Sequence, residues 1–148
     1  LAGKHLEFEP RLAEARWLSE HFSIHALMDL SDGLAGDLRH ILRASNVGAE
    51  FLKSAIPISR AAKAGASRAA PTSKPAFAAA LTDGEDFELL FTVVAKDAVK
   101  LLDAWKKKFP KLKLSCVGKI VAGEGITLRD KHGSHKLDAQ GYAHFASS

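Results

Sequence analysis

Cysteine is nearly absent from this sequence: Cys116 is the only one among 148 residues. A single cysteine excludes a disulfide within the chain and a zinc site built from several cysteines. Cys116 lies in the apolar run "KLSCVGKIV", so we expect a buried and unreactive thiol there. Any chemistry of this chain is therefore expected from other residue types.

Long apolar runs and basic clusters are also scarce. No run approaches the roughly 18 apolar residues that a membrane-spanning helix needs, and no signal peptide is visible. The formal net charge is +4, but the basic residues are spread out, and no aromatic residue is interleaved with the lysines at 106–108. The sequence also lacks a Walker-type phosphate loop, a Rossmann glycine fingerprint and a G-x-S-x-G motif. We expect neither a membrane nor a nucleic acid as a partner.

The apolar residues that are present suffice for one folded domain over residues 1–148. Hydrophobic residues make up 47% of the chain, and their spacing predicts helices over residues 10–22, 33–45 and 96–108. The expected strands cover residues 23–30, 49–57, 87–94, 113–121, 125–130 and 134–137.

The order of these elements indicates the fold class. Helices alternate with strands early in the chain, and turn signals cluster late. The "AGEG" segment between the strands ending at 121 and beginning at 125 predicts a hairpin. The pattern favours an α/β or α+β structure in which helices cover a mixed sheet.

The clearest helix, over residues 33–45, is amphipathic. Its apolar positions repeat at helical spacing: Leu34, Leu38, Ile41 and Leu42. Asp37, Arg39 and Arg43 fall on the opposite side, which we expect to face solvent.

Two carboxylates and a hydroxyl precede this helix in "DLSDG". Ser31 or Asp32 could cap the helix, which is worth about 1 kcal/mol, but capping leaves Asp29 unexplained at the end of an apolar strand. Alternatively, Asp29 and Asp32 are the hard oxygen ligands that suit Mg²⁺, which usually completes its shell with phosphate oxygens and water. Both interpretations, helix cap and metal–phosphate site, remain open from the residues alone.

A second acidic cluster lies in "LTDGEDFELLF", just ahead of a buried strand. It contains Asp83, Glu85, Asp86 and Glu88 within a few residues. A solvated turn is one interpretation. The other is a site for a cation or for a substrate that carries positive charge.

These segments together resemble a known family. "HALMDLSDGLAGDL", "LTDGEDFELLFTV", "VGKIV" and "GYAHF" follow the order found in the C-terminal half of the thiamine-monophosphate kinases, and "KHLEFEPRLAEARWL" fits the start of that half. The resemblance covers nearly the whole chain. It implies the fold of the C-terminal domain shared by the aminoimidazole ribonucleotide synthetase-like superfamily, a mixed sheet covered by helices.

The resemblance also implies an activity. The family transfers the γ-phosphoryl group of ATP to thiamine monophosphate, which gives thiamine diphosphate, and uses Mg²⁺ ions. By position, Asp29 and Asp32 match metal-binding aspartates, and Ser31 matches a residue that contacts ATP. Such transfer depends mainly on positioning and on neutralising phosphate charge, which agrees with an acidic turn that holds metal.

The substrate side of the resemblance involves later residues. Glu85 matches the acidic residue that meets thiamine, with Asp86 as the alternative register, and Tyr142 matches an aromatic residue lining the thiamine site. Thiamine carries a thiazolium cation, which an acid and an aromatic face both favour. Asp83 departs from the family, which usually has a glycine there.

The family's N-terminal half is absent from this sequence, which begins with Leu1. We therefore expect the C-terminal domain of a cytoplasmic kinase, with that missing domain of the same protein as its partner. The chain alone is expected to fold but not to catalyse, and the full-length form could be a homodimer. Two alternatives stay open: another ATP-dependent member of the superfamily, such as aminoimidazole ribonucleotide synthetase, selenophosphate synthetase or the hydrogenase maturation protein, and a stand-alone binding domain without catalysis.

Overall fold

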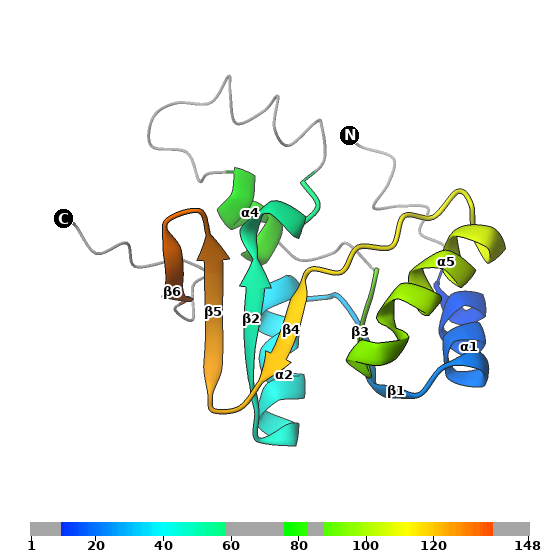
Figure 1. The fold of residues 1–148 in the computed structure, drawn as a ribbon, viewed down its shortest axis with the longest axis horizontal. Helices are drawn as coiled ribbons and strands as arrows, with labels where there is room; N and C mark the ends of the chain where they lie inside the picture. The colour runs from blue at the N-terminus through cyan, green and yellow to red at the C-terminus, as the bar shows by residue number, and fades with distance from the viewer. Residues whose placement is uncertain (1–9, 59–75, 83–87, 138–148) are drawn as a thin grey trace.

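A computed structural model describes residues 10–58, 76–82 and 88–137 of the chain. The elements alternate between helix and strand in the first half and are mostly strands at the end (Figure 1). Their bounds are α1 Leu12–His21, β1 Ile24–Asp29, α2 Leu34–Ser45, β2 Gly48–Leu52, α4 Ala76–Thr82, β3 Leu89–Val93, α5 Ala98–Lys108, β4 Gly118–Val121, β5 Gly125–Asp130 and β6 Gly133–Leu137.

The strands form two sheets. β1 and β3 pair antiparallel in a sheet of their own. The other sheet has four strands in the order β4-β2-β5-β6, with β2 and β5 parallel and the other pairs antiparallel. The expected α+β architecture with a mixed sheet is therefore confirmed, and β6 pairs with β5 as an extra strand at the edge.

The predicted hairpin between β4 and β5 is wrong. These two strands lie on either side of β2, so their connection passes over the start of β2. Gly48 lies under this connection, and a Cβ atom placed there would come within 3.1 Å of the carbonyl oxygen of Gly125. The small residue thus permits the close crossing, whereas sequence spacing alone favoured the simpler local pairing.

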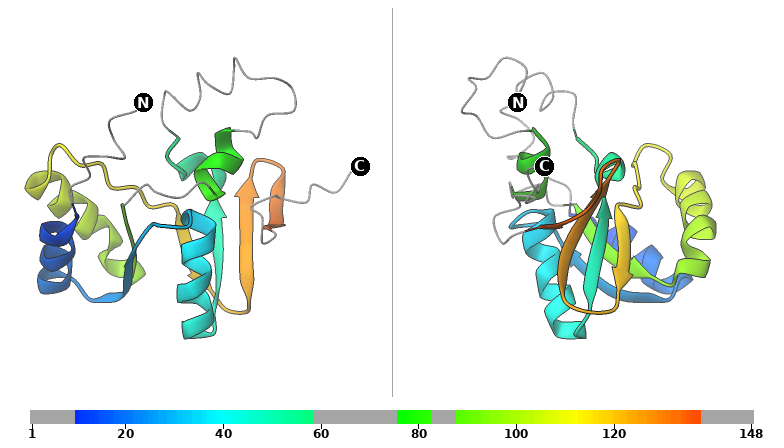
Figure 2. Two further views of the ribbon diagram at one scale, coloured as in Figure 1. Left: turned by 180° about the vertical axis from the view of Figure 1, so that it is seen from behind. Right: turned by 60° about the vertical axis from the view of Figure 1, so that its left-hand side comes forward.

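The larger of two cores, called the sheet core below, lies between α2, α4 and the four-stranded sheet. Figure 2 shows α2 packed across one face of that sheet. Aliphatic side chains dominate the buried residues of this core: Leu34, Ala35, Leu38, Leu42, Ala49, Phe51, Ile56, Leu81, Leu90, Ile126, Leu128 and Leu137.

The smaller core, called the aromatic core below, joins α1 and α5 to β1 and β3 (Figure 2). Only three of its residues are buried, and many half-buried aromatic rings surround them. The rings of Trp105 and Phe109 lie 4.7 Å apart, and Trp17 and Phe109 meet edge to face at 5.5 Å. Its buried residues are Leu18, Leu101 and Trp105.

β3 lies between the two cores. Leu89 and Phe91 pack in the aromatic core, while Leu90 packs in the sheet core. Successive residues of a strand point to opposite faces, so a strand buried on both faces needs a continuous apolar sequence. This explains the uninterrupted apolar run from Leu89 to Phe91.

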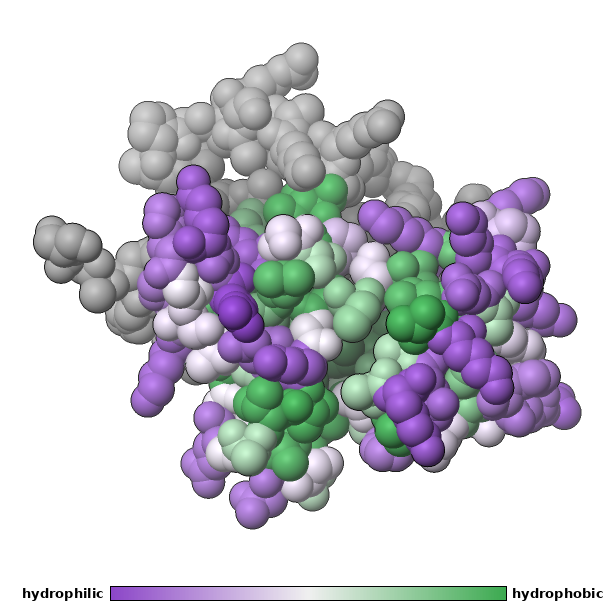
Figure 3. All heavy atoms as spheres, in the orientation of Figure 1, coloured by the Kyte–Doolittle hydropathy of each residue, from purple (hydrophilic) through white to green (hydrophobic). Residues whose placement is uncertain are grey.

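The face of the four-stranded sheet turned away from α2 is polar along its middle. Figure 3 shows hydrophilic side chains crossing this face between groups of apolar ones. Glu50 lies 3.2 Å from the Nζ atom of Lys119 and 3.7 Å from Nη1 of Arg129, and Ser134 donates a hydrogen bond to it at 3.2 Å. The hydrogen bond from Lys119 is the main reason why the pKa of Glu50 lies below its ordinary value, because it stabilises the charged form.

Other local expectations have mixed outcomes. β2 ends at Leu52 and is followed by a short 3₁₀ turn over Lys53–Ala55, so the expected strand over 49–57 is too long. Cys116 is exposed, which contradicts the expected buried thiol. No helix in the described part of the chain is long and apolar enough to cross a membrane.

Candidate functional site

The acidic turn connects β1 to α2 and begins beside β3. Asp29 is the last residue of β1, is exposed, and lies opposite Leu89 in the antiparallel register. The N–H of Leu30 still donates to the carbonyl oxygen of Glu88 at 2.8 Å. The turn thus starts from a paired strand end, which fixes the position of its first residues.

The capping interpretation of this turn is wrong. Gly33 is the N-cap residue of α2, and no side chain makes a capping hydrogen bond there. Gly33 has φ 91° and ψ 156°, a conformation that residues with a side chain rarely adopt. The side chains of Ser31 and Asp32 are both exposed and make no capping hydrogen bond to this helix end.

Asp37 is the residue that sequence reasoning misplaced. It was expected on the solvent side of α2, but its side chain is buried, with 1% relative exposure. Its Oδ2 atom accepts the backbone N–H of Ser31 at 2.9 Å and that of Asp32 at 3.0 Å. An acidic residue in the first turn of a helix that follows an irregular turn is the signal that could have indicated this role.

Three side chains at this turn come close enough to share a cation. One ligand atom from each of Asp32, Asp37 and His40 can be chosen so that all lie within 4.8 Å of one another. Asp29, the other predicted metal ligand, is not part of this group. Carboxylate oxygens are the donors that Mg²⁺ prefers, so the exposed Asp32 fits such an ion better than the imidazole of His40 does.

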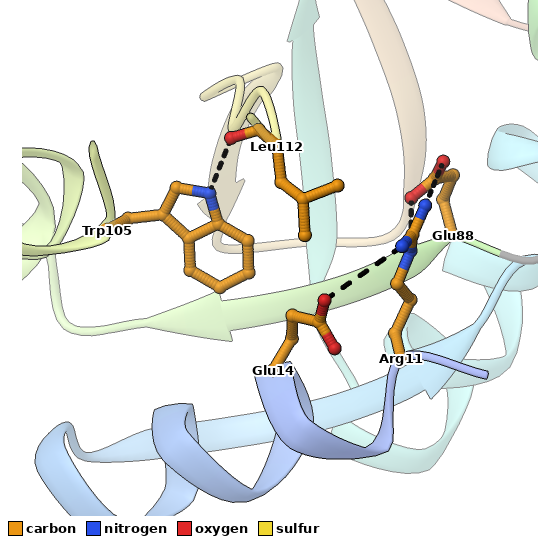
Figure 4. A network of polar contacts seen from close by, with 5 residues as sticks. All are labelled: Arg11, Glu14, Glu88, Trp105 and Leu112. Carbon is orange, nitrogen blue, oxygen red and sulfur yellow. Dashed lines mark hydrogen bonds and ion pairs between the residues drawn. The ribbon is translucent and has the colours of Figure 1, made fainter. Parts of the chain in front are cut away.

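The one described member of the second acidic cluster is paired with a base. Figure 4 shows Arg11 held between Glu88 and Glu14, at the start of α1. Its Nε and Nη2 atoms donate to the two carboxylate oxygens of Glu88, both at 3.3 Å, and its Nη1 atom lies 3.9 Å from Glu14. Glu88 is therefore engaged in a two-point ion pair with Arg11.

The remaining predicted substrate residues lie outside the described residues. These are Glu85, its alternative Asp86, and Tyr142, together with the unusual Asp83. The structure does show that Glu88, which ends the second acidic cluster, lies next to Leu30 in the first. Leu30 directly follows β1 and Glu88 directly precedes β3. The pairing of these two strands therefore brings together two residues that are far apart in the sequence.

Residues 2–131 match the family described as AIR synthase related protein, C-terminal domain. The chain belongs to this family. The matched region contains the acidic turn and every helix and strand up to the end of β5.

Relatives of this chain include proteins named thiamine-monophosphate kinase. The protein of that name from Rhodopirellula baltica is 35% identical over 145 residues, which are 97% of this chain and 44% of the relative. The one from Escherichia coli K12 is 34% identical over 148 residues, or 99% of this chain and 43% of the relative. The chain therefore spans less than half the length of these relatives.

Solved structures agree with the fold. Thiamine-monophosphate kinase from Stenotrophomonas maltophilia has a TM-score of 0.66 at 34% identity, covering 80% of this chain and 35% of that one. AaThiL complexed with AMPPCP and TMP has a TM-score of 0.63 at 27% identity, covering 95% and 44%. The hydrogenase maturation protein HypE from E. coli has a TM-score of 0.70 but only 21% identity, covering 86% and 39%, so it supports the fold alone.

Proposed function

We propose that this chain is the C-terminal domain of a thiamine-monophosphate kinase, which transfers the γ-phosphoryl group of ATP to thiamine monophosphate. The proposal depends on one combination: an exposed Asp29–Asp32 turn, in a chain 35% identical over 97% of its length to a kinase of that name. The relative AaThiL was solved with AMPPCP and TMP, which supports a site for both a nucleotide and a phosphorylated substrate.

In this proposal, Asp29 and Asp32 hold Mg²⁺ and Ser31 contacts ATP. When bound, Mg²⁺ neutralises charge on the phosphates and so lowers the barrier to transfer. The contribution of the chain is geometric: the paired end of β1 and the first turn of α2 hold the three side chains on one short turn. The N-terminal end of α2 adds a partial positive charge that favours phosphate oxygens nearby.

The substrate-binding residues are proposed in two segments that lie outside the described residues, 83–87 and 138–148. Glu85 and Tyr142 would meet the thiazolium ring of thiamine, the acid by charge and the ring by its face. Residues outside this chain, in the N-terminal domain of the same protein, would supply the rest of the nucleotide site. A cytoplasmic location and a homodimer of the whole protein stay predictions.

The test of the metal role uses the full-length protein. Asp29→Asn and Asp32→Asn should each lower formation of thiamine diphosphate at least about tenfold at limiting Mg²⁺, since each removes a charged ligand. Asp103→Asn is the matched control, because Asp103 is an exposed acid on α5, away from the turn. Normal activity of both turn variants across a Mg²⁺ titration would refute the metal role.

A second assay addresses the substrate. Tyr142→Ala should weaken use of thiamine monophosphate by up to about 30-fold, the equivalent of a cation–π contact of roughly 2 kcal/mol, while ATP affinity stays the same. Glu85→Gln should act in the same direction. A protein that consumes ATP with Mg²⁺ but yields no thiamine diphosphate would favour another ATP-dependent member of the superfamily.

A further inference from the structure

Asp37 is a buried carboxylate in a position where burial is costly. It lies in the first turn of α2, between residues of the sheet core, and only 1% of its surface is exposed. An ionised carboxylate loses its water on burial and needs hydrogen bonds in return. Its Oδ2 atom accepts hydrogen bonds from the backbone N–H groups of Ser31 and Asp32.

Both bonds converge on one atom, Oδ2, and they immobilise two successive peptide groups. These are the peptides on either side of Ser31, so they fix the direction in which the Ser31 side chain leaves the backbone, and they fix the peptide that precedes Asp32. The turn is also held at its two ends. Leu30 donates to Glu88 at 2.8 Å, and the N–H of Asp37 itself donates to the carbonyl oxygen of Gly33 at 3.0 Å.

We propose that Asp37 is a positioning residue for the reaction proposed above. Through Oδ2 it holds the backbone of residues 30–32 so that Ser31 and Asp32 face the phosphates and the metal, while its own side chain touches neither. The proposal depends on the proposed function of the turn. Positioning of this kind has a large effect on rate, because a shift of about 1 Å in a reacting group can cost about 100-fold.

The carboxylate of Asp37 could act in two ways: as a hydrogen-bond acceptor that positions the turn, or as a negatively charged ligand of the metal. Its carboxylate lies close enough to Asp32 and His40 to be considered a cation ligand. In Asp37→Asn the amide oxygen has two lone pairs and can accept both N–H groups, but the negative charge is gone. In Asp37→Ala both donors lose their partner. A positioning role therefore predicts that Asn rescues activity relative to Ala, and a ligand role predicts that it does not.

The experiment uses the full-length protein with a stability control. Leu38→Ala removes a buried side chain from the neighbouring position of α2 without touching the two hydrogen bonds. All variants are assayed at a temperature where each is folded, with thiamine diphosphate formation followed across a Mg²⁺ titration. Amide exchange of Ser31 and Asp32 is measured in parallel as a readout that does not depend on activity.

We expect Asp37→Ala to lower kcat by about 10- to 100-fold relative to Leu38→Ala, and Asp37→Asn to stay within about threefold of wild type. Exchange of the Ser31 and Asp32 amides should be at least about tenfold faster in Asp37→Ala than in the control. If Asn is as inactive as Ala, or if Ala matches Leu38→Ala, the positioning role is wrong. A wild-type protein that forms no thiamine diphosphate would instead refute the proposed function, and the positioning role in that reaction with it.

Discussion

The sheet core and the aromatic core differ in the side chains that fill them and in how completely those side chains are buried. The sheet core buries many aliphatic side chains almost completely between two helices and a sheet. The aromatic core has few fully buried residues and fills its remaining space with half-buried rings such as Trp17 and Phe109. Fully enclosed side chains have little room to adjust, whereas rings that border solvent have fewer packed neighbours to hold them.

The acidic turn lies where these two regions meet. β1, which precedes it, contacts both regions: Ile24 and Leu27 pack in the aromatic core, whereas Met28 packs in the sheet core, which α2 covers. The position of Asp29 thus depends on both regions, whereas that of Asp32, just before α2, depends mainly on the sheet core. A change in the packing of the aromatic core should therefore affect Asp29 more than Asp32, and the following tests are directed at that difference.

The largest expected effect is on the sheet core. Leu128→Ala removes a side chain with 0% exposure among dense neighbours and should lower the free energy of unfolding by about 4 kcal/mol. Leu18→Ala, also at 0% exposure but in the aromatic core, should cost about 2–3 kcal/mol, because half-buried rings can move into the space. Urea unfolding measures both. A larger loss for Leu18→Ala would mean that the aromatic core is the more rigidly packed of the two.

A smaller effect is expected from a single hydrogen bond in the aromatic core. The indole N–H of Trp105 donates to the carbonyl oxygen of Leu112 at 2.9 Å (Figure 4). Trp105→Phe keeps an aromatic ring but removes this donor, so it should cost about 1 kcal/mol beyond the loss of ring size. Trp17→Phe is the matched control for ring size. Equal losses of stability for the two variants would show that the hydrogen bond contributes nothing measurable.

The stability contributed by Asp130, at the end of β5, should depend on pH. The backbone N–H of His132 lowers the pKa of Asp130 below its ordinary value, and Lys53 at 3.5 Å acts in the same direction. The charged form therefore stabilises the fold above the unfolded pKa of about 4, and this contribution is lost as pH falls through the lower folded pKa. Asp130→Asn should destabilise the chain at pH 7, and the difference from wild type should shrink towards pH 3. A difference that is constant with pH would exclude this origin.

The smallest effect is expected at Cys116. Its thiol is exposed and makes a long contact, 3.6 Å, to the carbonyl oxygen of Gly118. Cys116→Ser should change stability by less than about 0.5 kcal/mol. The native thiol should also react with a thiol reagent nearly as fast as in urea. Slow modification of the native protein would contradict its exposed position.

The sequence predicted the elements better than their arrangement. Helical spacing identified α2 with its apolar face, and β5 has the predicted bounds, because both depend on local periodicity. The pairing of β2 between β4 and β5 was missed, since it joins residues far apart in the chain. Asp37 was missed for a related reason: apolar periodicity assigns every acid to solvent, but here the backbone of the preceding turn supplies its partners.

The position of β2 between β4 and β5 has a consequence for the folding pathway. Gly48 pairs with Val121 on one side and with Gly125 on the other. Both edges of β2 can therefore form their hydrogen bonds only after β4 and β5 have been synthesised. Contacts of such long sequence separation close large loops and tend to slow folding. During synthesis, the early part of the chain can form α2 but leaves β2 with two unpaired edges, which are sites for association with other chains. Expression should therefore be sensitive to truncation before residue 118, where β4 begins.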